Sequence, residues 1–435
     1  MGSTGRDTFQ GKTIRNREAV LSDVMDCSGN GAVGLKRRVV HSVIDKVYNW
    51  NNLEVASRKV VGNRGSAGVD GMSVVRWKEK EEEHLRELRR RLMNDTYRSK
   101  PVLRRYIPKP GSKKQRPLGI PAVKDRVCQQ TVQNVLSPVF EEYFHEDSHG
   151  FRPGRSTRTA AKRVEELRKQ GYRHVVDLDI RDFFGQVDRE ILMRLVGQVV
   201  KDRRVLGLIR GWLTAGVLEE GNVRYQMSGT PQGGVISPLL SNVYLTVLDN
   251  ALAEAGYRFV RYADDMLILC LSEKEAVEAL NQAKAVLGRL KLELNEEKTR
   301  ISSFDEGFDF LGFHFGKRGR SIARKSLKAF YGKVRKVTKR QQGDKPVTAV
   351  IKTLNPLLRG WSNYHCEGQN VGMFTRLDGW VRKRLRSYMY KRWRVFKWPR
   401  ENKPTAEEFE WMGLFSLRKV LRPKPLQLSL FPAPL

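Results

Sequence analysis

Apolar residues recur along this chain with two periods, one typical of helices and the other typical of strands. The three- to four-residue spacing predicts helices within 43–61, 77–92, 125–143, 159–169, 238–248 and 273–292. Short β-branched or apolar runs predict strands at 102–109, 116–121, 174–180, 259–262 and 266–270, and a further hairpin from 300–301 to 308–315. Helices and short strands are therefore expected to alternate through most of the chain.

Two adjacent carboxylates, Asp264 and Asp265, interrupt the apolar pattern between the last two of these strands. The spacing predicts a β-hairpin with the acids at its tip. An ordinary solvated turn is one interpretation, because Asp favours turns by bonding its own backbone. The apolar flanks favour burial instead, and a buried hairpin that aims two charges at one point requires a compensating cation such as Mg²⁺.

A third acid lies in the strand predicted over 174–180. The two-residue period places Asp177 and Asp179 on one face of that strand, and Phe183 and Phe184 follow directly. A metal ligand beside a bulky aromatic side chain suits a nucleotide site in which the aromatic ring contacts the sugar and selects it by shape. The alternative is a strand-end Asp that caps a turn while both Phe lie in the core, and we favour that structural interpretation for Asp177.

Two glycine-rich loops can approach a ligand closely. The loop 62–71 contains several glycines, although a surface connection is the commoner use of such a loop. The loop 228–238 carries Gln232 and enters a helix at Ser237, which we predict to be the N-cap. A loop of this kind can lie along a nucleotide while its amide hydrogen-bonds it, but many unrelated loops look similar.

A basic hairpin is predicted where the strands 102–109 and 116–121 flank the tip 110–115. Cations at such a tip can clamp a triphosphate or a nucleic-acid backbone, and Arg116 offers bidentate geometry. A solvated charged turn is the alternative.

Charge indicates a polyanionic partner. The 435 residues include 81 Lys and Arg against 48 Asp and Glu, and the resulting formal charge of +33 exceeds what solubility requires. Aromatic residues are not depleted, so we expect a folded basic protein of two or three domains. Between residues 317 and 400, 24 Lys and Arg face three acids, and five of the eight Trp lie there or just beyond. Basic helices with interleaved aromatics suit a nucleic-acid groove, whereas a merely solvated basic face would repel itself.

Cysteine usage and hydropathy bear on location. The four cysteines are scattered singly, which argues against a disulfide framework or a zinc module and fits a reducing setting. The chain lacks both a run of about 18 apolar residues and the apolar core of a signal peptide. We therefore expect a soluble cytoplasmic protein without a membrane partner.

Seven segments, in order, resemble the sequence blocks of reverse transcriptases, specifically the group II intron-encoded type, across residues 49–398. The segment 262–265 resembles the catalytic turn of the palm, 179–184 the first catalytic block and 230–238 the nucleotide-site block. The other four blocks are 150–156, 297–299, 310–313 and 359–364, of which the last resembles the thumb, or maturase, segment. One block alone is a weak signal, but seven in the right order are specific.

Two features depart from the family pattern. Gly185 stands where the family usually has an Asp directly after its Phe pair. The C-terminal segment lacks the Cys and His cluster of a homing endonuclease, so the resemblance implies a compact member without that domain.

The resemblance implies an α+β fold with the shape of a right-hand polymerase. The expected parts are an N-terminal extension, fingers with the N-terminal reverse transcriptase extension, a palm, a helical basic thumb (the maturase X segment), and a small basic DNA-binding-like C-terminal module. Their expected bounds are 1–45, 46–170, 171–316, 317–390 and 391–435.

The same resemblance implies a metal site of two Mg²⁺ ions. Asp179 and Asp264 would hold the ions, Asp265 would be a weaker or partial ligand, and Ile180 is included among the metal-binding residues. These three acids are the expected catalytic residues.

The nucleotide pocket and the nucleic-acid path are implied in the same way. Lys109 and Arg116 would clamp the triphosphate, Gln232 would line the pocket, and Phe184 would lie under the sugar and reject a 2′ hydroxyl. The expected nucleic-acid-binding residues are Arg152, Arg155, Lys298, Arg324, Lys328, Lys336 and Arg359.

The implied function is RNA-directed DNA polymerase: a nucleotidyltransferase that copies RNA into cDNA by two-metal catalysis, and that also binds its intron RNA to assist splicing and retrohoming. Its partners would be an RNA template, structured intron RNA, a DNA primer or target, and deoxynucleoside triphosphates. A splicing maturase with a secondary or decayed polymerase site is an alternative, although the three intact acids argue against decay. A domesticated reverse transcriptase in repair or phage defence is another.

Overall fold

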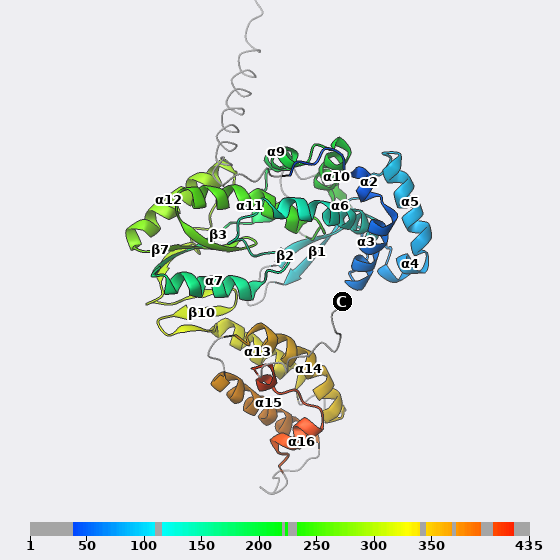
Figure 1. The fold of residues 1–435 in the computed structure, drawn as a ribbon. Coiled ribbons are helices and arrows are strands. Elements are labelled where there is room, and N and C mark those ends of the chain that lie inside the picture. The colour runs from blue at the N-terminus through cyan, green and yellow to red at the C-terminus, as the bar shows by residue number, and fades with distance from the viewer. Residues whose placement is uncertain are drawn as a thin grey trace, which may run out of the picture. The chain divides into compact units, whose positions relative to one another are not determined.

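The computed structural model describes residues 38–108, 115–219, 222–224, 233–339, 345–367, 371–392 and 403–421. Internal contacts divide the chain into two units, Met1–Ile301 and Ser302–Leu435, which are described separately (Figure 1). The predictions for Lys109 and Gln232 fall outside the described residues.

The N-terminal half of the first unit is mostly helical. Its helices are α2 Ile44–Val47, α3 Trp50–Gly62, α4 Val74–Glu79, α5 Glu81–Met93, α6 Val123–Glu141 and α7 Thr157–Lys169. The helix predicted over 43–61 is divided in two because Asn49 caps α3, its side chain accepting a hydrogen bond from the Asn51 amide. The segment 77–92 is likewise divided, at Lys80.

Further helices follow in the same unit: α8 Phe183–Gln186, α9 Arg189–Val199, α10 Arg203–Thr214, α11 Ser237–Glu254 and α12 Glu273–Arg289. Most residues of α11 are buried, including several polar ones, so it is an internal helix. Our prediction of Ser237 as the N-cap is wrong, because the N-cap is Ile236 and Ser237 is the first helical residue.

A four-stranded sheet, here called the central sheet, has the order β6-β7-β3-β8. Its strands are β3 His174–Asp179, β6 Arg258–Tyr262, β7 Asp265–Cys270 and β8 Arg300–Ser303. β7 is antiparallel to both β3 and β6 and is buried at every position after the first. The helices α7, α11 and α12 contact its strands (Figure 1), which explains the continuous apolar run of β7.

A second sheet has the order β2-β1-β4-β5. Its strands are β1 Val102–Pro108, β2 Gln115–Ile120, β4 Val217–Glu219 and β5 Asn222–Arg224. β1 and β2 form the predicted basic hairpin, with Ile107 opposite Arg116, and β1 pairs in parallel with β4.

The second unit begins with strands and continues as helices. The strands β9 Phe308–Phe310, β10 Phe313–Gly316 and β11 Gly319–Ile322 form a sheet of order β11-β10-β9. Our prediction that 300–301 pairs with 308–315 is therefore wrong, since Arg300 and Ile301 belong to β8 of the central sheet. The helices are α13 Arg324–Val337, α14 Val347–Tyr364, α15 Val371–Arg392 and α16 Ala406–Trp411, followed by the 3₁₀ helix η3 Leu417–Leu421.

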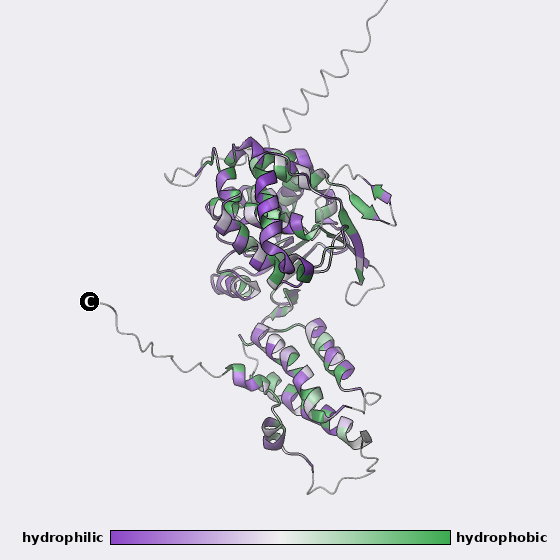
Figure 2. Cartoon of the chain, turned by 90° about the vertical axis from the view of Figure 1, so that its right-hand side faces the viewer, coloured by the Kyte–Doolittle hydropathy of each residue, from purple (hydrophilic) through white to green (hydrophobic). Residues whose placement is uncertain are grey.

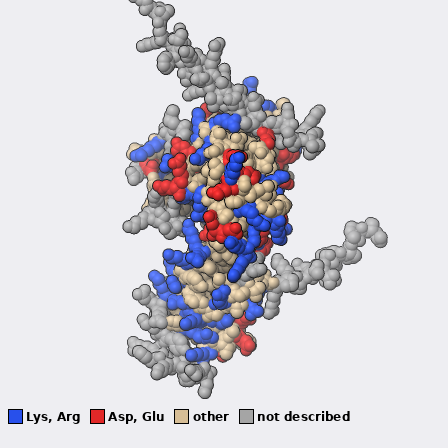
Figure 3. All heavy atoms as spheres, turned by 90° about the vertical axis from the view of Figure 1, so that its left-hand side faces the viewer, with Lys and Arg blue, Asp and Glu red and all other residues tan. Residues whose placement is uncertain are grey.

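The helices of the second unit pack around a compact aromatic core. Phe330 and Phe374 are buried there, and the rings of Trp361 and Trp380 lie 4.4 and 6.5 Å from that of Phe330. These two tryptophans therefore stabilise the core, whereas Trp411 is 95% exposed. Apolar and polar positions alternate around the helices (Figure 2), and Lys and Arg cover much of the visible face of this unit (Figure 3).

The described elements combine helices with antiparallel and mixed sheets, so the predicted α+β class is confirmed. Within the described residues, none of the helices is both long and apolar enough to cross a membrane.

Candidate active site

The three predicted acids meet at one end of the central sheet. Asp264 lies in the turn between β6 and β7, and Asp265 is the first residue of β7. In the strand register Asp265 stands opposite Tyr262 of β6 on one side and Asp179 of β3 on the other. The predicted hairpin with acids at its tip is thus present, and the third acid lies beside it.

Negative charge accumulates at this point. Desolvation, followed by Asp264, Asp179 and Asp177, raises the pKa of Asp265 to about 6, and Lys298 opposes this shift. The Asp265 residue remains exposed to solvent, so part of this effect is screened by water. Desolvation also raises the pKa of Asp177 to about 6, with Asp179 adding to the shift and Arg300 opposing it. A cation bound here would lower the pKa values of both Asp265 and Asp177.

Asp179 is held by the segment that follows α12. The Asn295 amide donates to the Asp179 carbonyl at 2.8 Å, and the Asp179 amide donates to Thr299 Oγ1 at 3.3 Å. Lys298 Nζ donates to Asp179 Oδ2 at 2.8 Å. Lys298, which we expected to bind nucleic acid, therefore forms an ion pair with a candidate catalytic acid.

The donor set fits a hard divalent cation. Carboxylate oxygens are the ligands that Mg²⁺ prefers, and the Lys298 ammonium shows that a positive charge is accommodated against Asp179. In the part of the chain that the structure describes, no group of three or more side chains is already arranged as a metal cluster. Ile180, next to Asp179, is buried and pairs with Leu294.

A buried arginine holds the turn that carries Asp264. Arg261 of β6 is 1% exposed and makes an ion pair with the fully buried Asp249 of α11, with donor–acceptor distances of 2.7 and 2.5 Å. Its Nη1 also donates to the Ala263 carbonyl at 2.9 Å and to Asn242 Oδ1 at 3.0 Å. Because Ala263 has a positive φ of 60°, this carbonyl contact fixes an unusual backbone conformation directly before Asp264.

The loop before α7 closes over the same turn. Asn242 Nδ2 donates to the Gly150 carbonyl at 2.8 Å, and the His149 amide donates to the Arg261 carbonyl at 2.7 Å. A Cβ at Gly150 would lie 2.3 Å from the Ala263 nitrogen, so only glycine fits there. We call Arg261, Asp249, Asn242, Gly150 and Ala263 the turn-support network.

Sequence reasoning did not identify the turn-support network. An arginine inside an apolar strand and an aspartate inside an apolar helix were the available signal, because buried charges require partners.

The aromatic pair Phe183 and Phe184 begins α8, shortly after Asp179 in the sequence. Phe184 is partly buried, and its ring meets that of Phe183 edge-on at 5.2 Å. Phe183 is buried against Tyr244, whose hydroxyl donates to the Leu290 carbonyl at 2.6 Å. The orientation of Phe184 therefore depends on Phe183, which packs against the hydrogen-bonded Tyr244.

Gly185, which stands where the family usually has Asp, packs closely against a neighbouring side chain. Asp182 precedes α8 with a positive φ of 37°, and a Cβ at Gly185 would lie 2.2 Å from Asp182 Oδ2. Any side chain at this position would therefore displace the Asp182 carboxylate.

The glycine-rich loop, where the structure describes it, lies against the basic hairpin. Gly233 has a positive φ of 117°, and a Cβ there would lie 2.5 Å from the Gly119 carbonyl of β2. Val235 donates its amide to the buried Gln129 side chain at 2.8 Å. Arg116, on the same β2, is exposed.

The predicted nucleic-acid contacts have different surroundings. Arg152 is buried; it binds the Glu141 carboxylate at 2.7 Å and donates to the His145 and Ser148 carbonyls, so its guanidinium is already engaged within the protein. Arg155 donates to the Glu146 carbonyl. The four predicted contacts of the second unit are all exposed: Arg324, Lys328 and Lys336 lie on α13 and Arg359 lies on α14, over the Phe415 ring.

Comparison with known proteins identifies two segments. Residues 107–315 match the family described as reverse transcriptase (RNA-dependent DNA polymerase), and residues 327–404 match the group II intron, maturase-specific domain. Protein YkfC of Escherichia coli (strain K12) is 33% identical over 301 residues, which cover 60% of this chain and 79% of YkfC.

A second relative is the group II intron-encoded protein LtrA of Lactococcus lactis subsp. cremoris, 36% identical over 254 residues. The match covers 57% of this chain and 40% of LtrA, so this chain spans less than half of that relative. Among solved structures, a chain of the partial Cas6-RT-Cas1--Cas2 complex is similar. The alignment covers 60% of this chain and 45% of the other, at 22% identity and a TM-score of 0.37.

The matched segments define the class: this chain is a reverse transcriptase, an RNA-directed DNA polymerase. Within that class it belongs to the group II intron-encoded family, in which the polymerase is joined to a maturase-specific domain. The resemblance found in the sequence is thereby confirmed. Members of this family act on RNA templates, bind intron RNA and use divalent metal ions.

Proposed function

We propose that this chain copies RNA into cDNA by extending a DNA primer with deoxynucleoside triphosphates. The observation that carries this proposal is the meeting of Asp179, Asp264 and Asp265 at the end of the central sheet, with Asp265 opposite Asp179. Three carboxylates at one point suit two Mg²⁺ ions, with Asp179 and Asp264 as the main ligands and Asp265 and Ile180 as additional ones.

When bound, the two ions would supply Lewis acidity that activates the primer 3′ hydroxyl and stabilises the leaving pyrophosphate. The protein's own contribution is positional. The turn-support network holds the turn that carries Asp264. The Asn295 amide at 2.8 Å and the Thr299 hydroxyl at 3.3 Å hold the Asp179 backbone. Pre-arranged carboxylates avoid reorganisation during the reaction.

Magnesium should stabilise the fold more at pH 7 than at pH 5. The pKa values of Asp265 and Asp177 are raised from about 3.8 to about 6, so at pH 7 both are ionised and repel each other in the folded state. The folded state therefore loses stability as the pH rises from about 3.8 to about 6 and these carboxyls ionise. A bound cation restores that stability. At pH 5 both carboxyls are largely protonated, and Mg²⁺ must displace the protons.

The melting temperature, measured with and without Mg²⁺ at both pH values, checks this prediction. Asp264→Asn should reduce the Mg²⁺-dependent shift at pH 7. Equal shifts at the two pH values would contradict the prediction.

The nucleotide pocket is proposed to lie between the acids, α8 and the basic hairpin. Arg116 and Lys109 would bind the triphosphate, Gln232 would contact the nucleotide, and the ring of Phe184 would exclude a 2′ hydroxyl. Support comes from the contact between the glycine-rich loop and β2, which carries Arg116.

Replacing Phe184 by Val should admit ribonucleotides. The smaller side chain leaves room for the 2′ hydroxyl, and pocket contacts of this size change discrimination by roughly ten- to a hundredfold. Single-nucleotide incorporation of each ribonucleotide and its deoxy counterpart measures the ratio. Phe184→Tyr, which keeps the ring, is the control and should retain discrimination; an unchanged ratio in Phe184→Val would exclude this role.

The second unit is proposed to bind the intron RNA and to assist its splicing and retrohoming. The match to the maturase-specific domain and the exposed cations Arg324, Lys328 and Lys336 on α13 favour this role. Primer extension on an RNA template with Mg²⁺, run beside splicing of a cognate intron, tests both proposals. Splicing without extension would favour a maturase whose polymerase site is secondary.

A further inference from the structure

The first two turns of α6 hold two segments that lead to the proposed nucleotide pocket. Asp125 Oδ2 accepts a hydrogen bond from the Lys100 amide at 3.1 Å, just before β1, and its Oδ1 accepts one from the Tyr97 hydroxyl at 2.6 Å. One turn later in α6, Gln129 Oε1 accepts a hydrogen bond from the Val235 amide at 2.8 Å, in the glycine-rich loop. Because β1 is one strand of the basic hairpin, α6 anchors both the hairpin and the loop.

The contact between Gln129 and Val235 is shielded from solvent. Gln129 is 4% exposed. The cavity beside it, which Gly234 and Ile236 also line, measures about 10 Å³ and has room for one water molecule at most. A backbone N–H in such surroundings needs a partner within the protein. A side chain without an oxygen at position 129 would therefore deprive the Val235 amide of its acceptor and release the loop from α6.

The same end of the loop lies directly on β2. A Cβ at Gly233 would be 2.5 Å from the Gly119 carbonyl and 3.1 Å from Leu118 Cδ1, so the two backbones approach with no room for a side chain between them. Gly119 is buried and stands three residues after the exposed Arg116 on the same strand. The loop is thus held between α6 on one side and the strand that carries Arg116 on the other.

We propose that Gln129 is a positioning residue for the incoming deoxynucleoside triphosphate. It holds the glycine-rich loop at Val235 and so sets the distance between this loop and β2, which are two walls of the proposed nucleotide pocket. The inference rests on the proposed polymerase function. Gln129 acts through the loop, and a wall that moves by a fraction of an ångström weakens the binding of the group it contacts.

Gln129→Met tests the proposal in the full-length chain, because methionine has a similar shape and only a weak acceptor. Single-nucleotide incorporation is measured over a range of deoxynucleoside triphosphate concentrations, on an RNA template with a DNA primer and Mg²⁺. The half-saturating nucleotide concentration should rise roughly tenfold, the size expected when one buried hydrogen bond is lost, and the maximum rate should change less. Gln129→Glu keeps an oxygen acceptor and should restore the half-saturating concentration to nearly the wild-type value.

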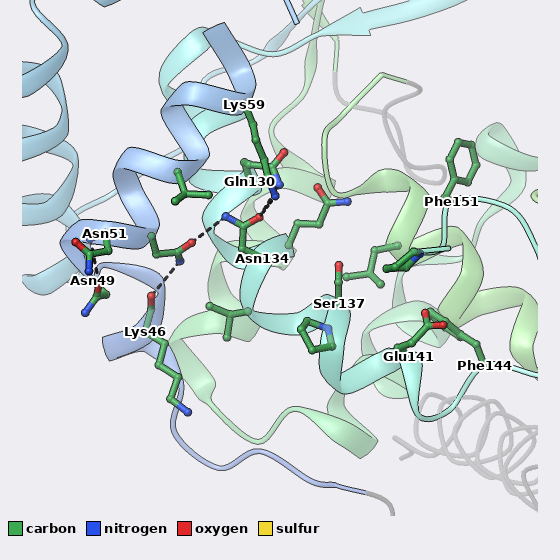
Figure 4. Close-up of a pocket in the computed structure, with 17 residues that line it drawn as sticks. Lys46, Asn49, Asn51, Lys59, Gln130, Asn134, Ser137, Glu141, Phe144 and Phe151 are labelled. Carbon is green, nitrogen blue, oxygen red and sulfur yellow. Dashed lines mark hydrogen bonds between the residues drawn. The ribbon is translucent and has the colours of Figure 1, made fainter. Parts of the chain in front are cut away.

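Gln130→Met is the matched control, because Gln130 is the next residue of α6 and is also buried. Its Nε2 donates to Asn134 Oδ1 of the same helix at 2.9 Å, in the pocket that Figure 4 shows. The control should keep the wild-type half-saturating concentration. A rise as large as in Gln129→Met would indicate a general packing effect in α6 and overturn the proposal. An unchanged value in Gln129→Met, or no recovery in Gln129→Glu, would overturn it as well.

Gly233→Ala tests the same loop from the side of β2 and keeps the test available if Gln129→Met does not fold. Its methyl group would push the loop away from the Gly119 carbonyl, so the half-saturating concentration should rise here too, and an unchanged value would contradict the proposal. Fluorescence anisotropy without nucleotide gives the affinity for the primer and template, which every variant should retain. A parallel loss of that affinity would indicate a merely structural role and overturn the proposal.

Hydrogen exchange of the Val235 amide, measured without nucleotide or Mg²⁺, reports the hold on the loop independently of catalysis. Exchange should be faster in Gln129→Met than in the wild type or in Gln129→Glu, and equal rates in all three would overturn the proposal. If the wild type does not extend a primer at all, the proposed polymerase function is wrong and this inference falls with it. If the wild type extends the primer and Gln129→Met needs no more nucleotide than it does, the inference alone is wrong.

Discussion

Asp264→Ala should abolish primer extension on an RNA template while leaving RNA binding nearly intact. Asp264 lies in the turn between β6 and β7, beside Asp265 and close to Asp179. Alanine removes a proposed main ligand of both ions, so the hydroxyl is no longer activated and the leaving group is no longer stabilised. The loss should reach several orders of magnitude. Binding should survive because the basic surfaces of the chain are unchanged.

Primer extension and RNA anisotropy, measured on the same preparation, check this result, with splicing as a third readout. Asp305→Ala is the control, because the Asp305 side chain is 72% exposed and far along the chain from the acids. Extension by Asp264→Ala at the wild-type rate would exclude the assigned catalytic site. Loss of splicing along with extension would indicate that the acids also serve the RNA-binding role.

Arg261→Met should destabilise the protein and stop extension. Removing the guanidinium leaves the fully buried Asp249 without its partner, a change that costs about 3–5 kcal/mol in comparable buried pairs. It also removes the 2.9 Å hydrogen bond to the Ala263 carbonyl that fixes the backbone before Asp264. Denaturant unfolding measures the first effect and primer extension the second.

The double variant Arg261→Met with Asp249→Leu separates the two effects. Its buried side chains carry no charge, so most of the lost stability should return. Extension should stay low, because neither new side chain can hold the Ala263 carbonyl. If extension recovers together with stability, the hydrogen bond to the turn is not needed for catalysis.

Local pattern was sufficient to predict the elements that carry the acids. The apolar run Met266–Leu269 predicted a buried strand, and β7 is buried there on both faces. The two-residue period of 174–180 placed Asp179 on one face of its strand, and the observed register sets it opposite Asp265. Strong periodicity identifies such segments without knowledge of their partners.

Long-range partners explain what the sequence did not reveal. Arg300 and Ile301 form a short run whose pairing with β3 depends on a strand more than a hundred residues earlier, so a local hairpin was predicted instead. Arg152 was expected on nucleic acid from the family resemblance, and no pattern in the sequence indicates that its guanidinium binds Glu141. The Arg261–Asp249 pair was missed because its role depends on the burial of both side chains, which the sequence does not show.

The backbone links between the loop before α7 and β6 have a consequence for motion. The His149 amide donates to the Arg261 carbonyl, and the Arg261 amide donates to the Asp147 carbonyl at 2.9 Å, so both amide hydrogens are locked inside the protein. Such hydrogens exchange with solvent only when the surrounding structure opens, which is rare and slow for a buried sheet. We therefore expect the turn that carries Asp264 to be ordered without a bound nucleotide, and hydrogen exchange of these two amides to be slow.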